Sequence, residues 1–286
     1  MVDVPVIVQP VPDEVGVADS DGVAISWKRF GDGPQSVLFV PTWNLVDSRT
    51  LRHQVEALRD SFRVITYDAR GSGESGCPPA GYGFDLHADD AVAVMKATGT
   101  TSSGVVTASR GASVSILLAA LHPDMVERLV MIAPALNVER EPPEDSAAFW
   151  VERDRYEGWE HYSAPAWRAD FPGFLKWFMA EVFSEPDSEE TIDEVTAVAL
   201  DADSEMLIVQ DSEQDWNQAV THIPQVRCPA LVIQGGDDRA QDPATARALV
   251  AALPSARLVW LERLGHRPDI RRPDLVNPVL AELLDE

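Results

Sequence analysis

Residues 104–120 read Gly104-Val-Val-Thr-Ala-Ser109-Arg-Gly-Ala-Ser-Val-Ser-Ile-Leu-Leu-Ala-Ala120. A short apolar run, typical of a buried strand, leads into a turn of small residues, and a helical pattern follows. The turn has the form Thr107-x-Ser109-x-Gly111, which differs from G-x-S-x-G in its first residue. A serine on such a strand-to-helix turn holds its hydroxyl clear of the backbone, at the positive end of the helix. The stretch therefore predicts a strand-turn-helix unit with Ser109 as a candidate nucleophile.

Short apolar runs alternate with helical patterns on both sides of this unit. Strands are expected at residues 23–28, 36–40, 63–67, 104–107, 128–132, 230–234 and 257–261. Helices are expected at residues 49–60, 86–97, 110–121, 243–252 and 274–284. Alternation of this kind predicts the α/β class, with a mostly parallel central sheet and helices on both of its faces.

Residues 137–222 interrupt the alternation, because they lack clear strand patterns and look mostly helical. They hold 22 of the 47 acidic residues, only 5 of the 23 basic ones, and 12 of the 21 aromatic residues. We therefore predict an α/β core made of residues 1–136 and 223–286, with a helical cap, or lid, of residues 137–222 inserted into it.

The composition restricts the kind of partner. The 286 residues carry a formal net charge of −24, which argues against binding to nucleic acid or to an anionic membrane. The first residues have neither a basic start nor a long apolar core, and no eighteen apolar residues run together, so we expect neither a signal peptide nor a transmembrane helix. Two cysteines far apart form no disulfide framework and no metal-site spacing. We expect a cytoplasmic protein, as a monomer or homodimer, with free thiols and no bound metal.

An acid and a histidine follow the later predicted strands. The first of these strands ends in Gly235-Gly-Asp-Asp238, and the second leads to Gly265-His266. The carboxyl ends of parallel strands meet at one edge of a sheet, so Ser109, an aspartate and His266 are expected close together there. Spacing from Gly235 favours Asp238 as the acid, and Asp237 remains the alternative.

With the order serine, aspartate, histidine, the chain resembles the α/β-hydrolase superfamily over about residues 20–285. The segment Tyr67-Asp-Ala-Arg-Gly-Ser-Gly-Glu-Ser75 is similar to the D-x-R-G-x-G-x-S segment of that superfamily. Residues 157–183 and the ending Gly265-His-Arg-Pro resemble bacterial hydrolases related to those fused to cyclase or regulator domains. The resemblance implies the α/β-hydrolase fold and a Ser-His-Asp catalytic triad.

One loop departs from the superfamily pattern. Pro41-Thr42-Trp43 stands where the superfamily usually carries His-Gly after its third strand. The resemblance implies that the backbone N–H groups of Trp43 and Arg110 form the oxyanion hole. Thr42 restricts the backbone there more than glycine would, and Trp43 is alternatively a core aromatic residue.

These residues suggest a mechanism without a cofactor. Ser109 attacks a carboxylic ester or related acyl bond, His266 moves the proton, and Asp238 orients the imidazole. The aromatic cap residues Trp150, Trp159, Trp177 and Phe178 are candidates for a pocket that binds a small hydrophobic substrate, or else form the core of the cap itself. The Arg110 side chain either faces this pocket, where it would attract a carboxylate, or faces the cap or solvent.

Two other classes of function fit the same residues. A lyase, or an enzyme that cleaves a C–C bond, would use His266 as a base without an acyl-enzyme. A ligand-sensing protein would retain the triad for binding alone. The loss of His-Gly at Pro41-Thr42 favours these two classes somewhat, and the sequence leaves the choice among the three open.

Overall fold

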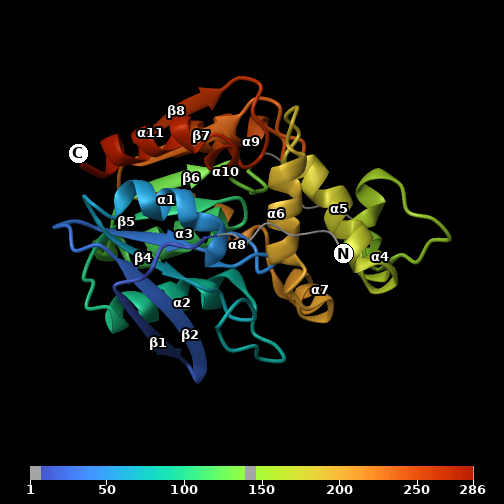
Figure 1. Cartoon of the computed structure of the whole chain (residues 1–286), viewed down its shortest axis with the longest axis horizontal. Coiled ribbons are helices and arrows are strands. Elements are labelled where there is room, and N and C mark those ends of the chain that lie inside the picture. The colour runs from blue at the N-terminus through green and yellow to red at the C-terminus, as the bar shows by residue number, and fades with distance from the viewer. Residues whose placement is uncertain (1–7, 139–145, 286) are drawn as a thin grey trace.

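The computed structural model describes residues 8–138 and 146–285, so residues 139–145 of the predicted cap lie outside the described part. Eight strands form one sheet in the order β1-β2-β4-β3-β5-β6-β7-β8 (Figure 1). Only β2 runs antiparallel to its neighbours, β1 and β4, and all pairs from β4 to β8 are parallel. The strands are β1 (Glu14–Ser20), β2 (Val23–Phe30), β3 (Ser36–Val40), β4 (Arg63–Tyr67), β5 (Ser103–Ala108), β6 (Val126–Ile132), β7 (Ala230–Gly235) and β8 (Ala256–Leu261). The predicted α/β class and mostly parallel sheet are confirmed.

Strand β1 has no counterpart among the predicted strands. It lies at the edge of the sheet and pairs with β2 alone. Val15 and Val17 are 63% and 64% exposed, and the buried face of β1 carries the small residues Ala18 and Ser20 instead. Pairing with β2 holds this edge strand in place. Its own sequence gives little indication of a strand.

Helices cover both faces of the sheet, as predicted. On one face α1 (Arg52–Leu58) and α11 (Pro273–Asp285) pack their apolar side chains against the strands. On the other face lie α2 (Phe84–Ala97), α3 (Gly111–Leu121) and α9 (Ala244–Ala252). Strand β5 is buried along its whole length between these layers, which explains its continuous apolar pattern.

The chain between β6 and β7 is helical in its described part. Its helices are η3 (Ser146–Trp150), η4 (Gly158–His161), α4 (Ala164–Ala169), α5 (Phe171–Val182), α6 (Glu189–Ala199), α7 (Ser204–Glu213), α8 (Gln218–His222) and η5 (Ile223–Gln225), where η marks a short 3-10 helix. Helices α4 to α7 gather at one side of the sheet (Figure 1). They share an apolar cluster that includes Trp167, Phe174 and Leu207. Helix α8 instead packs against α3, and its Ala219 belongs to the apolar core beside the sheet.

Candidate active site

Ser109 lies between the last residue of β5 and the start of α3, at the carboxyl edge of the sheet. Its φ angle is +52°, in the left-handed region that residues other than glycine rarely adopt. Its N–H donates to the carbonyl of Ile132 at 2.9 Å, and its own carbonyl accepts from Ala135 at 3.1 Å. Hydrogen bonds to the end of β6 and to the loop after it thus hold the turn and compensate for the strained backbone at Ser109.

The departure at Thr107 is accommodated by the neighbouring strand. The Thr107 hydroxyl donates to the carbonyl of Val40 at 3.1 Å, so the side chain is buried with a partner. A Cβ atom added at Gly111 would lie 2.0 Å from the Thr107 Oγ1 and 2.4 Å from the carbonyl oxygen of Pro41. The motif therefore needs glycine at Gly111, because Thr107 and the Pro41 carbonyl leave no room for a side chain there. At its first position the motif tolerates the threonine Thr107.

The structure brings Ser109, His266 and Asp238 together from three separate loops. The His266 Nε2 lies 2.8 Å from the Ser109 Oγ, and its Nδ1 lies 2.8 Å from the Asp238 Oδ2. His266 is 3% exposed and Asp238 is 8% exposed. The three side chains form a hydrogen-bonded chain in which the imidazole of His266 can accept the proton of the Ser109 hydroxyl.

The Asp238 carboxylate is held on both of its oxygens. Oδ2 also accepts from the Gln234 amide at 3.0 Å, and Oδ1 accepts from the N–H groups of Ala240 and Gln241, each at 2.9 Å. Burial alone would raise the pKa of Asp238, but His266 and these donors outweigh it and lower that pKa. Asp238 is thus an ionised partner for the imidazole.

Asp237 has a different environment from Asp238. Its side chain is exposed, and its backbone N–H donates to the carbonyl of Leu264 at 2.9 Å. Of the two aspartates that the sequence offers, Asp238 makes the hydrogen bond to His266.

The end of α5 and the residues after it hold the loop that carries His266. The N–H of His266 donates to the carbonyl of Val182 at 3.0 Å. The N–H of Gly265 donates to the Glu185 carboxylate at 2.7 Å, and the Ser184 hydroxyl donates to the Asp237 carbonyl at 2.9 Å. One segment of the helical insertion therefore positions both the histidine loop and the aspartate loop.

The loop after β3 and the start of α3 each offer a backbone donor near Ser109. Among the described residues, no acceptor is found for the N–H of Trp43 or for the N–H of Arg110. The Trp43 ring is 5% exposed and packs in the insertion's apolar cluster, 5.4 Å from the Phe178 ring. The Trp43 ring is thus a core aromatic, while the oxyanion role of its N–H stays a prediction.

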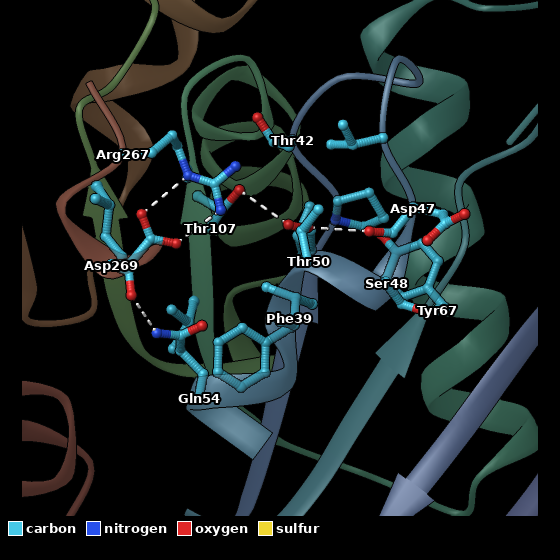
Figure 2. Close-up of a pocket in the computed structure, with 17 residues that line it drawn as sticks. Phe39, Thr42, Asp47, Ser48, Thr50, Gln54, Tyr67, Thr107, Arg267 and Asp269 are labelled. Carbon is cyan, nitrogen blue, oxygen red and sulfur yellow. Dashed lines mark hydrogen bonds and ion pairs between the residues drawn. The ribbon is translucent and has the colours of Figure 1, made fainter. Parts of the chain in front are cut away.

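A small cavity of about 30 Å³ is lined by residues that include Thr42, Thr107, Arg267 and Asp269. Figure 2 shows Thr107 next to Arg267 and Asp269, with Thr50, Asp47 and Tyr67 on the opposite side. Arg267 follows the histidine directly and makes a two-bond ion pair with Asp269, at 2.9 and 2.7 Å. The carbonyl of Asp269 accepts from the Gln54 amide of α1 at 2.8 Å. These contacts tie the His266 loop to the helix layer of the sheet.

A larger cavity of about 350 Å³ opens in front of Ser109 and His266. Trp159 and Phe178, two of the predicted pocket residues, line it. The other two lie outside its lining: Trp150 is 48% exposed and packs on Phe149, and Trp177 packs edge-on against Trp159 at 5.1 Å. The remaining lining residues are Trp43, Arg110, Ala135, Leu136, Asn137, Tyr162, Asp211, Trp216, Ala240 and Gln241.

A second, apolar cavity of about 40 Å³ also touches Ser109 and His266, on the side of Trp43 and Phe178. It is lined mainly by aliphatic and aromatic side chains, including Met179 and Phe183 from the insertion. Ser109 and His266 therefore lie where a large, partly polar cavity and a small apolar one meet.

The Arg110 side chain faces the larger cavity and is buried there. It forms an ion pair with Asp211 of α7 at 3.1 Å and donates to the Gln214 amide oxygen at 2.9 Å. It also hydrogen-bonds to the Tyr162 hydroxyl, which donates to Asp211 at 2.7 Å. Neither Asp211 nor Tyr162 stands out in the sequence, because the insertion is rich in acids and aromatics throughout.

The described residues contain neither a metal-binding cluster nor a membrane-spanning helix. Across residues 8–138 and 146–285 there is no group of three or more His, Cys, Asp or Glu side chains able to hold a metal ion. Over the same residues no helix is both long enough and apolar enough to cross a bilayer.

Comparison with known proteins gives related sequences and structures. The family model for the alpha/beta hydrolase fold matches residues 35–267. A protein of Klebsiella pneumoniae named "Putative carbamate hydrolase RutD" is 26% identical over 234 residues, which cover 80% of this chain and 84% of that protein. The enol-lactonase from Burkholderia xenovorans LB400 superposes with a TM-score of 0.81 at 23% identity, over 95% of this chain and all of the other. A thermophilic esterase from Thermogutta terrifontis superposes with a TM-score of 0.78 at 23% identity, over 95% and 98% of the two chains.

Proposed function

The chain belongs to the α/β-hydrolase family and is a hydrolytic enzyme, and we propose that it cleaves carboxylic esters of small, largely apolar molecules through Ser109, His266 and Asp238. The observation that carries the proposal is the hydrogen-bonded chain of these three side chains, with 2.8 Å at both of its links to His266. Serine is a weak nucleophile on its own, and an adjacent base oriented by an acid activates it.

The first half of the reaction forms an acyl-enzyme. The Ser109 Oγ attacks the ester carbonyl carbon while His266 Nε2 takes the hydroxyl proton. The tetrahedral intermediate then collapses, the bond to the leaving alcohol breaks, and His266 returns the proton to the alcohol oxygen. Asp238 stays ionised throughout and stabilises the imidazolium, consistent with its lowered pKa.

The second half of the reaction uses water. His266 takes a proton from the water, the resulting hydroxide attacks the acyl carbon, and the bond to the Ser109 Oγ breaks. The proton held by His266 returns to that oxygen, so the free acid leaves and the enzyme is restored. Every step uses groups of the chain and water alone.

The oxyanion of both tetrahedral intermediates needs donors that have no other partner. We assign this role to the N–H groups of Trp43 and Arg110, for which no acceptor is found among the described residues. Loss of one donor of this kind lowers kcat by about 10²–10³-fold. The proline and threonine before Trp43 would then replace His-Gly in shaping the loop.

The helical insertion has the role of a cap in this proposal. Trp159 and Phe178 from the insertion supply apolar walls of the larger cavity, and Met179 and Phe183 supply walls of the smaller one. A cavity of about 350 Å³ lies within the usual size range of small-molecule sites. Its mixture of aromatic and polar walls fits a small, largely apolar substrate.

A fluorophosphonate probe tests the nucleophile. We expect covalent labelling of the wild type with the probe mass on Ser109, and no labelling of Ser109→Ala. Hydrolysis of p-nitrophenyl esters of increasing acyl length then tests the reaction, and we expect turnover that is lost in Ser109→Ala. Labelling that persists in that variant would contradict the assignment. Ligand binding without any ester turnover would favour the sensing function instead.

A further inference from the structure

The wall of the larger cavity contains a buried ion pair that the proposed hydrolysis does not use. The Arg110 and Asp211 side chains are 7% and 8% exposed, and both line the cavity that holds Ser109 and His266. Arg110 comes from the residue next to the nucleophile, and Asp211 comes from α7 of the insertion. The pair therefore joins the two parts of the chain at the site itself.

Neighbouring side chains hold the pair in one position. The Arg110 guanidinium lies 4.2 Å from the centre of the Trp43 ring and 4.9 Å from that of Trp216, as in a cation–π contact. Gln214 accepts from one terminal nitrogen of the guanidinium, and Tyr162 and Asp211 accept from the other. A charged group fixed in this way presents its remaining hydrogen-bonding positions in a defined direction.

Hydrogen-bonding capacity remains on both partners. A guanidinium has five N–H donors, and within residues 8–138 and 146–285 those of Arg110 reach only Gln214, Tyr162 and Asp211. The Asp211 Oδ1 accepts from Tyr162 and Arg110, but in the same part of the chain its Oδ2 accepts only one bond, of 3.3 Å. The cavity wall therefore offers a donor and an acceptor side by side.

Stability gives little reason for an ion pair at this place. The cost of removing both charges from water roughly offsets their attraction, so an apolar pair of similar size is often equally stable. The rest of the cavity wall combines aromatic and aliphatic side chains with a few polar ones, and among the described residues no other Asp, Glu, Lys or Arg lines it. A polar pair kept in such a wall next to Ser109 is better explained by a ligand that needs it.

We propose that Arg110 and Asp211 determine substrate specificity by binding a neutral amide group on the acyl part of the substrate. The amide carbonyl accepts from the Arg110 guanidinium, and the amide N–H donates to Asp211. A carboxylate at this place would be repelled by Asp211, and an ammonium group would be repelled by Arg110. The inference rests on the proposed hydrolysis at Ser109 and adds to it the class of substrate.

Three p-nitrophenyl esters with acyl chains of the same length test the inference. The adipamate ester ends in a carboxamide, and the hemiadipate ester ends in a carboxylate. The 6-methylheptanoate ester ends in an isopropyl group, which has the same shape but no polar atoms. The leaving group is the same in all three, so differences in kcat/KM report the far end of the acyl chain. The rate with Ser109→Ala is subtracted as background. We expect the wild type to prefer the carboxamide to each of the others by at least about tenfold, a difference of about 1.4 kcal/mol.

Asp211→Asn is the decisive variant, because it leaves the positive charge of Arg110 unpaired. We expect the ratio of kcat/KM for the carboxylate to that for the carboxamide to rise at least about tenfold. Glu205→Gln is the matched control, since it removes one negative charge from the same helix, at an exposed ion pair with Arg168 outside the cavity. This control should leave the ratio unchanged.

The outcomes separate the two proposals. If no ester is hydrolysed and Ser109 is not labelled, the proposed function fails and the inference fails with it. If the esters are hydrolysed but the wild type shows no preference for the carboxamide, only the inference is overturned, and no variant is needed to show it. An equal change of the ratio in Asp211→Asn and Glu205→Gln would also overturn it.

Discussion

The Nδ1 atom of His266 lies 2.8 Å from the Oδ2 atom of Asp238. Asp238 is buried, while its neighbour Asp237 is exposed. In Ser-His-Asp enzymes, an amide in place of the acid favours the wrong imidazole tautomer and lowers kcat by about 10⁴-fold. We therefore expect Asp238→Asn to lose about four orders of magnitude in kcat on a p-nitrophenyl ester.

Asp237→Asn is the matched control for this prediction. It makes the same chemical change one residue away, and we expect its kcat to stay within a few-fold of the wild type. Circular dichroism and thermal melting of both variants check that the fold is retained. A large loss in Asp237→Asn with near-normal activity in Asp238→Asn would reverse the assignment of the acid.

Gly111→Ala tests the close approach behind the Ser109 turn. The added Cβ would lie 2.0 Å from the Thr107 Oγ1 and 2.4 Å from the Pro41 carbonyl oxygen, so backbone must move. Overpacking of this kind costs about 1–3 kcal/mol, even though alanine is the better helix former. We expect that loss in the free energy of unfolding, measured by urea denaturation.

Gly76→Ala serves as the comparison, because its added Cβ would come no closer than 3.4 Å to any neighbour and its φ angle is not positive. We expect a much smaller change in the urea midpoint. Equal effects of the two substitutions would show that the space around Gly111 does not limit the motif.

The Arg70–Asp90 pair should be important for folding. The two side chains are 4% and 0% exposed, and Asp90 accepts two hydrogen bonds from Arg70, at 2.8 and 2.6 Å. Asp90→Asn would leave a buried guanidinium without its counter-charge, which costs about 3–5 kcal/mol. Thermal and urea unfolding should both report this loss.

The exposed pair of Arg168 and Glu205 provides a control of the same chemistry. Both of its side chains are about half exposed, at 49% and 57%. Exposed ion pairs contribute about 0–1 kcal/mol, so Glu205→Gln should barely change the unfolding midpoint. A similar loss in both variants would mean that burial of Arg70 is not the cause.

The proposed selectivity should depend on pH. Burial raises the pKa of Asp211 to about 6, although Arg110 acts in the opposite direction. The charged and titratable groups that face Asp211 are Arg110 and Tyr162, which bond to it, and His266, which lines the same cavity. Above about pH 6 both side chains are charged, so the ion pair is neutral overall. Below that pH Asp211 is protonated, and the positive charge of Arg110 is no longer balanced.

The ratio of kcat/KM for the carboxylate ester to that for the carboxamide ester should therefore rise as the pH falls through about 6. A pH effect on the chemical step that the two esters share cancels in the ratio, and the substrate carboxylate remains ionised until the pH falls well below that value. In Asp211→Asn the ratio should be high and independent of pH. A flat ratio in the wild type would contradict the prediction.

Much of the fold follows from local patterns. The buried run of β5 and the alternation of strands and helices predicted the parallel sheet, because each pattern lies within a few residues of chain. The edge strand β1 escaped prediction, since its exposed valines carry no burial pattern. The positive φ at Ser109 agrees with the turn expected from small residues around it.

The sequence by itself determined the order of serine, aspartate and histidine and their place at the carboxyl edge of the sheet, because that edge follows from strand direction. Only the tertiary structure decided which aspartate reaches His266, which aromatic residues line the cavity, and that Arg110 pairs with Asp211. Arg110 and Asp211 are 101 positions apart in the sequence. No local spacing encodes such a contact, because it depends on how the insertion packs over the sheet. The sequence also does not distinguish the one carboxylate that becomes buried from the many other acids of the insertion.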